Sequence, residues 1–244
     1  MNDLPQIFRV ARIDARLAPF DWDFARDRAG DIAAHWAQAV AKKPAMFDGR
    51  VLLGHALDYT PDNGGLLRSR YFETAFSAFL AYRDFGFPGG RVFNGFAMAA
   101  LRSADDAFLL GEMGAHTASA GMSYFPAGTP DRDDVVGDTV DLAGSVRREL
   151  REETGLVFDD GEIDPVWTIV RYAGRVACMR PVRLSRSADE IAAEVETFLA
   201  REKEPELAGM RIVRSMADVD RLNVPEFARL YLAHEFSAVR ASSC

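Results

Sequence analysis

The feature that most constrains this chain is a segment in its second half that must form a sharply ended helix. Within Leu142–Thr154, the apolar residues Val146 and Leu150 are four positions apart, which places them on one helix face. Gly155 follows where the helix must stop, because glycine readily takes the left-handed conformation that closes a last turn. Leu156 can then fold back over that turn. The sequence therefore predicts a rigid helix with one face in a core.

Three glutamates determine the chemistry of this helix. Glu149, Glu152 and Glu153 fall at positions i, i+3 and i+4, so their carboxylates share one helix face. Like charges at this spacing destabilise a helix by about 0.2–0.5 kcal/mol per pair. Mg²⁺ or Mn²⁺ would remove this repulsion, because these hard cations bind carboxylate oxygens together with substrate phosphates. The alternative is an ordinary solvated face on which Arg148 and Glu152 form an i,i+4 ion pair.

The hydrophobic periodicity of the remaining chain changes between strand-like and helix-like segments. Strands are expected at Ile7–Ile13, Val51–Tyr59, Val92–Leu101, Ala107–Met113, Val166–Tyr172, Arg175–Leu184 and Met210–Val213. Further helices are expected at Trp22–Lys43, Ser187–Lys203 and Val224–Val239. The order lacks strict βαβ alternation, which predicts a mixed α/β fold with a helix-flanked mixed sheet and not a Rossmann fold. Gly86–Gly90 marks a boundary between residues 1–90, an N-terminal extension packed on the rest, and a main domain of residues 91–244.

The charge balance and the cysteines limit the partners and the location. The chain of 244 residues has 37 acidic and 29 basic residues, so nucleic acid is not expected as a partner. Cys178 and Cys244 form no C-x-x-C pair, which argues against a zinc site or a disulfide framework, and Cys178 is expected in the core. Residues 1–12 do not resemble a signal peptide, and no 18-residue apolar run occurs. We therefore expect a cytoplasmic protein without a membrane partner, and a homodimer is left open.

The acidic helix and the loop before it resemble a known signature. Arg148–Leu156 matches the second half of the Nudix hydrolase signature, G-x5-E-x7-R-E-U-x-E-E-x-G-U with U aliphatic, at all seven of its fixed positions. Phe125–Gly128 is similar to the F-P-G-G sequence that leads into this motif in many Nudix members. The resemblance implies a Nudix-like α/β/α sandwich with a mixed sheet, and it does not explain residues 1–90, the N-terminal extension. It also implies an enzyme that hydrolyses a diphosphate linkage in a small nucleoside-diphosphate-type metabolite.

The first half of the signature is altered in this chain. Val140 stands where the family has glutamate, and Asp134 stands where it has glycine. If Gly128 is the loop glycine, the loop is six residues longer than in the family. Asp138 and Asp141 are then the candidates to stand in for the missing acid.

The resemblance also implies a role for each matching residue. Glu152 and Glu153 would be the main ligands of Mg²⁺ or Mn²⁺, and Glu149 would be a further ligand or the base for the attacking water. Arg148 would hold Glu149 by a charge-assisted hydrogen bond. The backbone carbonyl of Gly128 would complete the metal coordination. The catalytic residues implied are therefore Arg148 and Glu149.

Residues outside the motif are weaker candidates. Some Nudix members use an acid from a distal loop, for which Glu204 and Glu206 are candidates, and a solvated loop is the alternative. His116 lies in the loop before Phe125, where it could contact a substrate. The histidines form no H-E-x-x-H motif and the chain has no Gly-Lys pair, so neither that metal motif nor a P-loop is present.

The substrate class follows only from analogy within the family. Nudix enzymes that cleave coenzyme A carry a basic element just before F-P-G-G, whereas Gly114–Tyr124 contains no arginine or lysine. The aromatic N-terminal region, including Tyr71–Thr74 and Tyr82–Asp84, is similar to that of longer Nudix hydrolases of nucleotide sugars. A sugar nucleotide or ADP-ribose is therefore the favoured small phosphorylated substrate. A coenzyme A or acyl-CoA diphosphatase, and a catalytically silent domain that binds a nucleotide or a protein, are the alternatives.

Overall fold

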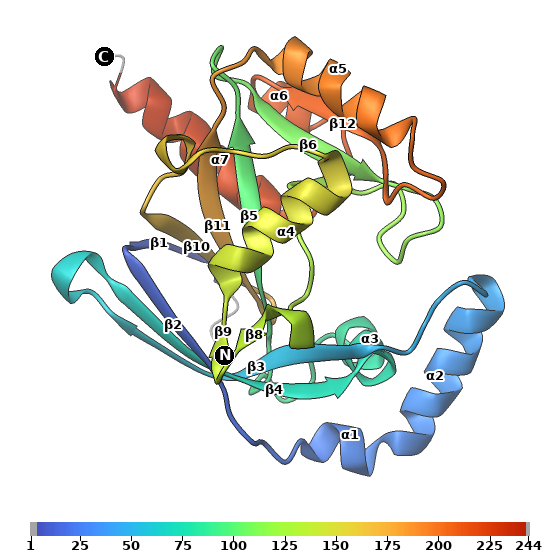
Figure 1. The fold of residues 1–244 in the computed structure, drawn as a ribbon. Helices are drawn as coiled ribbons and strands as arrows, with labels where there is room; N and C mark the ends of the chain where they lie inside the picture. Colours follow the sequence, from blue (N-terminus) through green and yellow to red (C-terminus); the bar gives the residue numbers. More distant parts are fainter. Residues whose placement is uncertain (1–3, 243–244) are drawn as a thin grey trace.

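The structure, a computed structural model, describes residues 4–242 and contains two mixed sheets with helices around them (Figure 1). The larger sheet has seven strands in the order β1-β10-β11-β5-β6-β12, with β7 paired to β6. Its strands are β1 (Gln6–Val10), β5 (Asn94–Arg102), β6 (Phe108–Met113), β7 (Ser123–Tyr124), β10 (Trp167–Tyr172), β11 (Arg175–Arg183) and β12 (Leu207–Val213). In this sheet β11 is parallel to β5, and the other pairings are antiparallel. The sheet is therefore mixed, as the sequence predicts.

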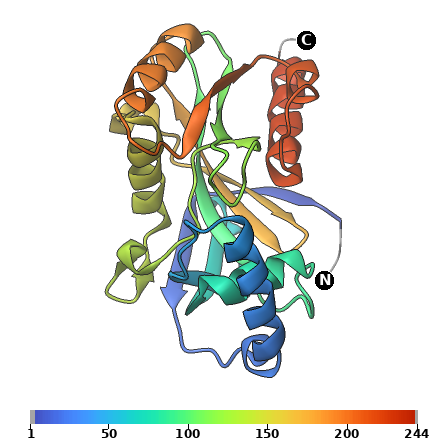
Figure 2. The same cartoon turned by 90° about the vertical axis from the view of Figure 1, so that its right-hand side faces the viewer.

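Helices cover both faces of the larger sheet. In Figure 2, α4 (Leu142–Thr154) and α5 (Ala188–Leu199) lie on one face, while α7 (Glu226–Ser242) lies on the other. Along β5, Leu101 packs in the core that includes α4, whereas Met98 packs in the core that includes α7. Because successive side chains of a strand point to opposite faces, a strand covered on both sides must be apolar throughout. The predicted α/β/α sandwich is confirmed.

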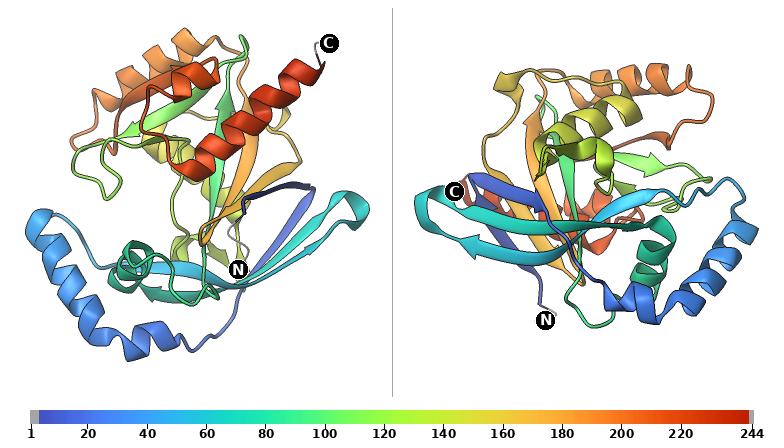
Figure 3. Two further views of the ribbon diagram at one scale, coloured as in Figure 1. Left: turned by 180° about the vertical axis from the view of Figure 1, so that it is seen from behind. Right: turned by 60° about the horizontal axis from the view of Figure 1, so that its bottom comes forward.

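The smaller sheet has five strands in the order β3-β4-β2-β9-β8. They are β2 (Arg12–Leu17), β3 (Arg50–Thr60), β4 (Leu66–Ala75), β8 (Val135–Val136) and β9 (Thr139–Val140). Three helices accompany this sheet: α1 (Asp23–Asp27), α2 (Ala29–Lys42) and α3 (Phe76–Asp84). A separate aromatic core, which includes Trp22, Phe72 and Tyr82, joins them to β3 and β4. The outer end of the β3–β4 hairpin projects on the side away from α2 (Figures 1 and 3).

Residues 1–90 contribute strands to both sheets. The expected single strand Ile7–Ile13 is two strands, because the chain leaves the larger sheet after Val10 and enters the smaller one at Arg12. Between them the backbone N–H of Ala11 donates to the carbonyl of Gly64 (2.9 Å). In the smaller sheet, β8 and β9 come from the second part of the chain and lie next to β2. Segments from before and after Gly90 are therefore interleaved.

The remaining expected elements agree with the structure except at some ends. The expected helix Trp22–Lys43 is divided into α1 and α2, because the backbone at Arg28 leaves the helical region (φ −109°, ψ 21°). The helix expected over Ser187–Lys203 ends at Leu199. The long loop after β6 contains β7, β8 and β9, and also η2 (Arg132–Asp134), a short 3₁₀ helix.

Cys178 is buried in the core that includes α4, as expected, whereas Cys244 lies outside the described residues. Tyr71 and Tyr82, from the N-terminal aromatic region, are also buried. Within residues 4–242, no helix combines the length and the apolar character needed to span a bilayer.

Candidate active site

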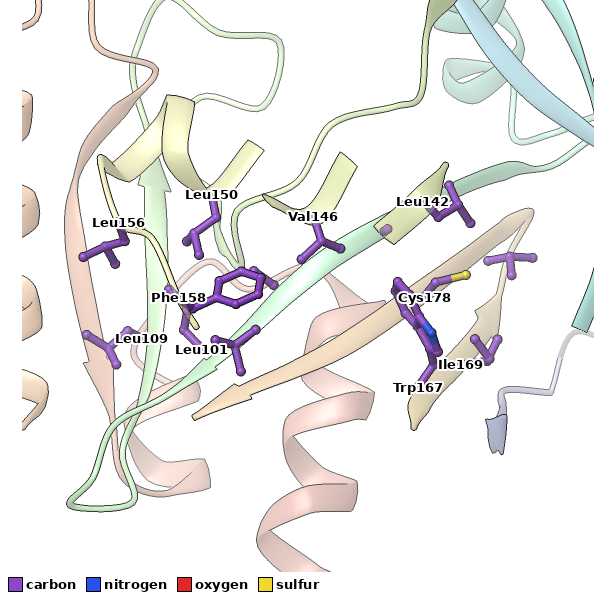
Figure 4. Packing of buried hydrophobic residues seen from close by; sticks show 14 of the residues in the cluster. Leu101, Leu109, Leu142, Val146, Leu150, Leu156, Phe158, Trp167, Ile169 and Cys178 are labelled. Atoms are coloured by element: carbon purple, nitrogen blue, oxygen red, sulfur yellow. The ribbon is translucent and has the colours of Figure 1, made fainter. Parts of the chain in front are cut away.

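Helix α4 is fixed by its apolar face and by both of its ends. Val146 and Leu150 are fully buried and point toward the strands of the larger sheet (Figure 4). At the first turn, the carboxylate of Asp141 accepts a hydrogen bond from the backbone N–H of Gly144 (2.9 Å), which satisfies a donor that the helix start leaves free. At the other end, Gly155 has a φ of 71°, as the sequence predicts. The acids of α4 are therefore carried on a rigid support.

The three glutamates of α4 differ strongly in exposure. The side chain of Glu152 is 54% exposed and that of Glu149 is 13% exposed. Glu153 is only 5% exposed, and its Oε2 is buried without a hydrogen-bond partner in the described part of the chain. Glu153 follows Leu150 by three positions, which turns it toward the core. The predicted acidic face therefore differs in exposure along its width, with Glu152 in solvent and Glu153 in the interior.

Burial changes the protonation of the two inner glutamates. It raises the pKa of Glu149 to about 7 against the opposing effect of Arg148, and neighbouring carboxylates add to the rise. Burial, together with the charges of Glu149 and Glu206, raises the pKa of Glu153 well above its usual range. An ionised carboxylate that is buried without a counter-charge is costly. The pair is therefore suited to a bound cation, which would favour the charged form of both.

Arg148 joins three carboxylates around this pair. Its Nη2 lies 2.9 Å from Oε1 of Glu149 and donates to Asp134 Oδ1 and Oδ2 at 2.9 and 3.0 Å. Its Nη1 donates to Oε2 of Glu152 at 3.2 Å. The i,i+4 pair expected on a solvated helix face is thus present together with the contact to Glu149 that the family resemblance implies.

Gly128 brings the backbone of the preceding loop against Glu149. A Cβ added at this position would lie 2.4 Å from Oε1 and 2.6 Å from Cδ of Glu149. Real Cβ atoms essentially never make contacts below 3.0 Å, so a side chain here would displace the carboxylate. The structure therefore places Gly128 beside Glu149, and a side chain at this position would require the carboxylate of Glu149 to move.

The expectation for the missing signature acid is wrong. The side chain of Asp141 caps α4, and that of Asp138 accepts a hydrogen bond from Arg16 (2.7 Å) in an exposed ion pair. The acid of this loop that contacts Arg148 is Asp134, at the position where the family has glycine. The extra length of the loop allows this, because η2 folds the chain back toward α4. The signal available in the sequence was Asp134 itself, an acid at the position where the signature has glycine.

Glu206 approaches the inner glutamates from the loop before β12. Its charge raises the pKa of both Glu149 and Glu153. Its backbone carbonyl accepts a hydrogen bond from the N–H of Gly114 (2.7 Å), which ties this loop to the end of β6. Glu206 and Glu204, the other candidate, are both exposed. Of the two acids considered from the sequence, Glu206 is the one whose charge reaches the site.

Two further residues of the loop before Phe125 have distinct positions. The ring of His116 lies 3.0 Å from where a Gly114 side chain would be, so it is folded back on its own loop. Burial raises the pKa of Tyr124 to about 12, and the charges of Glu153 and Glu206 add to this rise. Tyr124 was not singled out from the sequence, although its place directly before Phe125 was a usable signal. It is a neighbour of the acidic pair.

The residues present fit a divalent cation, although their side chains are not gathered as a complete set of ligands. Within residues 4–242, no group of three His, Cys, Asp or Glu side chains is already arranged to hold a metal ion. One reason is that Glu152 bonds to Arg148 and faces solvent. The unpartnered Oε2 of Glu153 and the close approach of Gly128 to Glu149 nevertheless leave acidic oxygen where a cation could bind.

Comparisons with known proteins give loose structural similarity. No family model and no curated protein matches the chain. A MutT protein from Methanosarcina mazei Go1 is 16% identical and covers 58% of this chain and 91% of its own, with a TM-score of 0.41. The C-terminal domain of mouse MUTYH, in a complex with human PCNA, is 10% identical and covers 60% and 89%, with a TM-score of 0.39. A Nudix hydrolase from M. smegmatis, RenU, is 12% identical and covers 61% and 83%, with a TM-score of 0.34. At these scores, a functional assignment must depend on the site itself.

Proposed function

We propose that this protein is a Nudix-type hydrolase that uses Mg²⁺ or Mn²⁺ to cleave a diphosphate linkage in a small nucleoside-diphosphate-type metabolite. The observation that carries the proposal is the buried pair Glu149 and Glu153 beside Gly128, with Oε2 of Glu153 unpartnered. A buried carboxylate oxygen that has no hydrogen-bond partner is unfavourable unless a positive charge joins it. The same pair lies in the segment that matches the Nudix signature.

In this proposal each residue has a defined task. Glu149, Glu152, Glu153 and the carbonyl of Gly128 would hold the cation. A bound divalent cation would neutralise the diphosphate, lower the pKa of a water molecule and stabilise the departing phosphate. Glu149 would be either one of these ligands or the base that accepts a proton from the attacking water. Arg148 orients Glu149 through the 2.9 Å contact.

Calorimetric titration with Mn²⁺ tests the cation site. We expect the wild-type protein to bind Mn²⁺, and Glu153→Gln to bind it on the order of tenfold or more weakly. Glu194→Gln is the matched control, because Glu194 is an exposed acid on α5 that pairs with Arg186. Equal Mn²⁺ affinity in the wild type and in Glu153→Gln would overturn the proposed site.

We favour a two-part substrate such as a sugar nucleotide or ADP-ribose. Elements of residues 1–90 support this, because they lie close to the loops of the site. The Nζ of Lys43, at the end of α2, donates to the carbonyl of Thr117. Arg83, on α3, is near enough to Tyr124 for its charge to lower the pKa of that hydroxyl against the effect of burial. The extension and the main domain would then act on one substrate.

Product analysis decides between this substrate class and the alternatives. UDP-glucose, ADP-ribose and coenzyme A would be incubated at matched concentration with Mg²⁺ or Mn²⁺, and the products separated by chromatography. We expect a nucleoside monophosphate and a sugar phosphate from the first two. Preferential release of 3′,5′-ADP from coenzyme A would support the coenzyme A alternative. Mn²⁺ binding without any product would support a catalytically silent domain.

The formal net charge of −8 disfavours nucleic acid as the partner, and a small phosphorylated ligand is the partner in this proposal. A cytoplasmic location belongs to the same proposal.

A further inference from the structure

Val140 stands where the signature has an acid, and Arg148 contacts an acid from elsewhere in the same loop. Val140 is 2% exposed and packs in the apolar core that includes α4, so a glutamate would not fit its surroundings. Arg148 nevertheless has a buried carboxylate partner, because its Nη2 donates to both oxygens of Asp134 at 2.9 and 3.0 Å. The side chain of Asp134 is 2% exposed.

We infer that Asp134 is a positioning residue, which fixes Arg148 and through it Glu149. The inference rests on the proposed function of this site. It concerns a residue that lies six positions before Val140 in the sequence, outside the part of the chain that matches the signature.

Asp134 is itself held firmly, which a positioning residue requires. Its Oδ2 accepts a hydrogen bond from the backbone N–H of Asp131 at 3.1 Å, which closes a capping box around η2. Its backbone carbonyl accepts a hydrogen bond from the N–H of Asp141 at 2.7 Å. Because Asp141 is the capping residue of α4, the segment bearing Asp134 is tied directly to the start of the catalytic helix.

Residues of the smaller sheet hold both ends of the segment 130–139. The N–H of Leu52, on β3, donates to the carbonyl of Pro130 at 2.6 Å, and that of Leu17, at the end of β2, donates to the carbonyl of Asp138 at 2.8 Å. Between these points, Arg132 pairs with Glu73 on β4. The N-terminal extension, which the signature does not cover, thus supports the loop that carries Asp134.

Besides Glu149, two acids bind the guanidinium of Arg148, and the buried one determines its orientation. Glu152 offers an exposed oxygen at 3.2 Å, whereas Asp134 offers a buried carboxylate. Water and salt screen the exposed pair more strongly than the buried pair. Without the charge of Asp134, we expect the guanidinium to lose its fixed orientation and Glu149 to lose a defined partner.

Side-chain NMR of arginine tests the contact without any assay of activity. A guanidinium bonded through Nη1 and Nη2 rotates slowly, so Arg148 should give resolved Nη signals that disappear in Arg148→Lys. We expect Asp134→Asn to lose these signals by averaging. Asp138→Asn, the matched control, removes an exposed acid from the same loop and should keep them. Retention of the resolved signals in Asp134→Asn would overturn the inference.

Kinetics then test whether the contact matters for the reaction. We expect Asp134→Asn to lower kcat by roughly 10- to 100-fold, with KM changed by less than about twofold. In the Arg148→Lys background the same change should have little further effect, because both remove one arrangement. Asp134→Glu keeps the charge and should recover part of kcat. An active wild type with unchanged kcat in Asp134→Asn would overturn the positioning role.

The two experiments separate the inference from the proposed function. A wild type that hydrolyses no substrate of the panel, but whose Arg148 signals depend on Asp134, would contradict the proposed function and support the positioning of Arg148. An active wild type whose Arg148 signals are averaged would support the proposed function and contradict the inference.

Discussion

Replacement of Gly128 by alanine is expected to disable the site and leave the fold intact. The added Cβ would lie 2.4 Å from Oε1 and 2.8 Å from Oε2 of Glu149, whereas ordinary van der Waals contact begins at 3.4 Å. The obstructing atoms belong to the end of a flexible side chain, so Glu149 can swing away while the loop keeps its path. The carboxylate must then move by about 1 Å, and a displacement of that size can lower a rate by about 100-fold.

The assay combines kcat, measured on the best substrate of the panel with Mg²⁺, and the thermal midpoint. For Gly128→Ala we expect kcat to fall by about 100-fold while Tm stays close to that of the wild type. Gly161→Ala is the control, because a Cβ at Gly161 meets nothing within 4 Å, and it should change neither quantity. Wild-type kcat in Gly128→Ala would refute the importance of the contact. A large fall in Tm would refute the view that only Glu149 yields.

Two further predictions concern stability. Gly155→Ala should lower the free energy of unfolding by about 1–2 kcal/mol in urea titrations, because φ is +71° and a Cβ would lie 2.5 Å from the ring of Phe198; an unchanged midpoint would contradict the tight helix end. Metal-free protein should be less stable at pH 8 than at pH 6, and Glu149→Gln should reduce this difference. The pKa of Glu149 is raised from 4.5 to about 7, so its contribution is fully present below 4.5 and is lost as pH rises through 7; equal pH dependence in both proteins would contradict the raised pKa.

The elements of the larger sheet could be predicted because their signals are local. Helix α4 begins at Leu142 and ends at Thr154, as predicted. Its two signals, the apolar spacing and the glycine that follows, both lie within a few residues of the helix. The same holds for β10 and β11, whose observed bounds differ from the expected ones by at most one residue. The division of Ile7–Ile13 between two sheets could not be predicted, because it depends on strands paired far along the chain.

The residues of the site could be predicted from the sequence, whereas the burial of their side chains and their ion pairs could be predicted only in part. Arg148, Glu149 and Gly128 could be located from the motif, and the structure brings them together. The burial of Glu153 depends on how closely α4 packs on its sheet, and the contact of Asp134 depends on the path of a longer loop. Periodicity carries neither kind of information.

Glu153 links the cost of folding to the proposed activity. Val146 and Leu150 each contribute about 1.5–3 kcal/mol by burial, and this allows α4 to hold an inward carboxylate that is unfavourable by itself. A cation that binds only the folded state would stabilise it increasingly as its concentration rises. Tm of the wild type should therefore rise with Mn²⁺, and that of Glu153→Gln should start higher and rise less, as measured by differential scanning calorimetry. Equal responses in the two proteins would mean that the buried carboxylate does not take part in binding the cation.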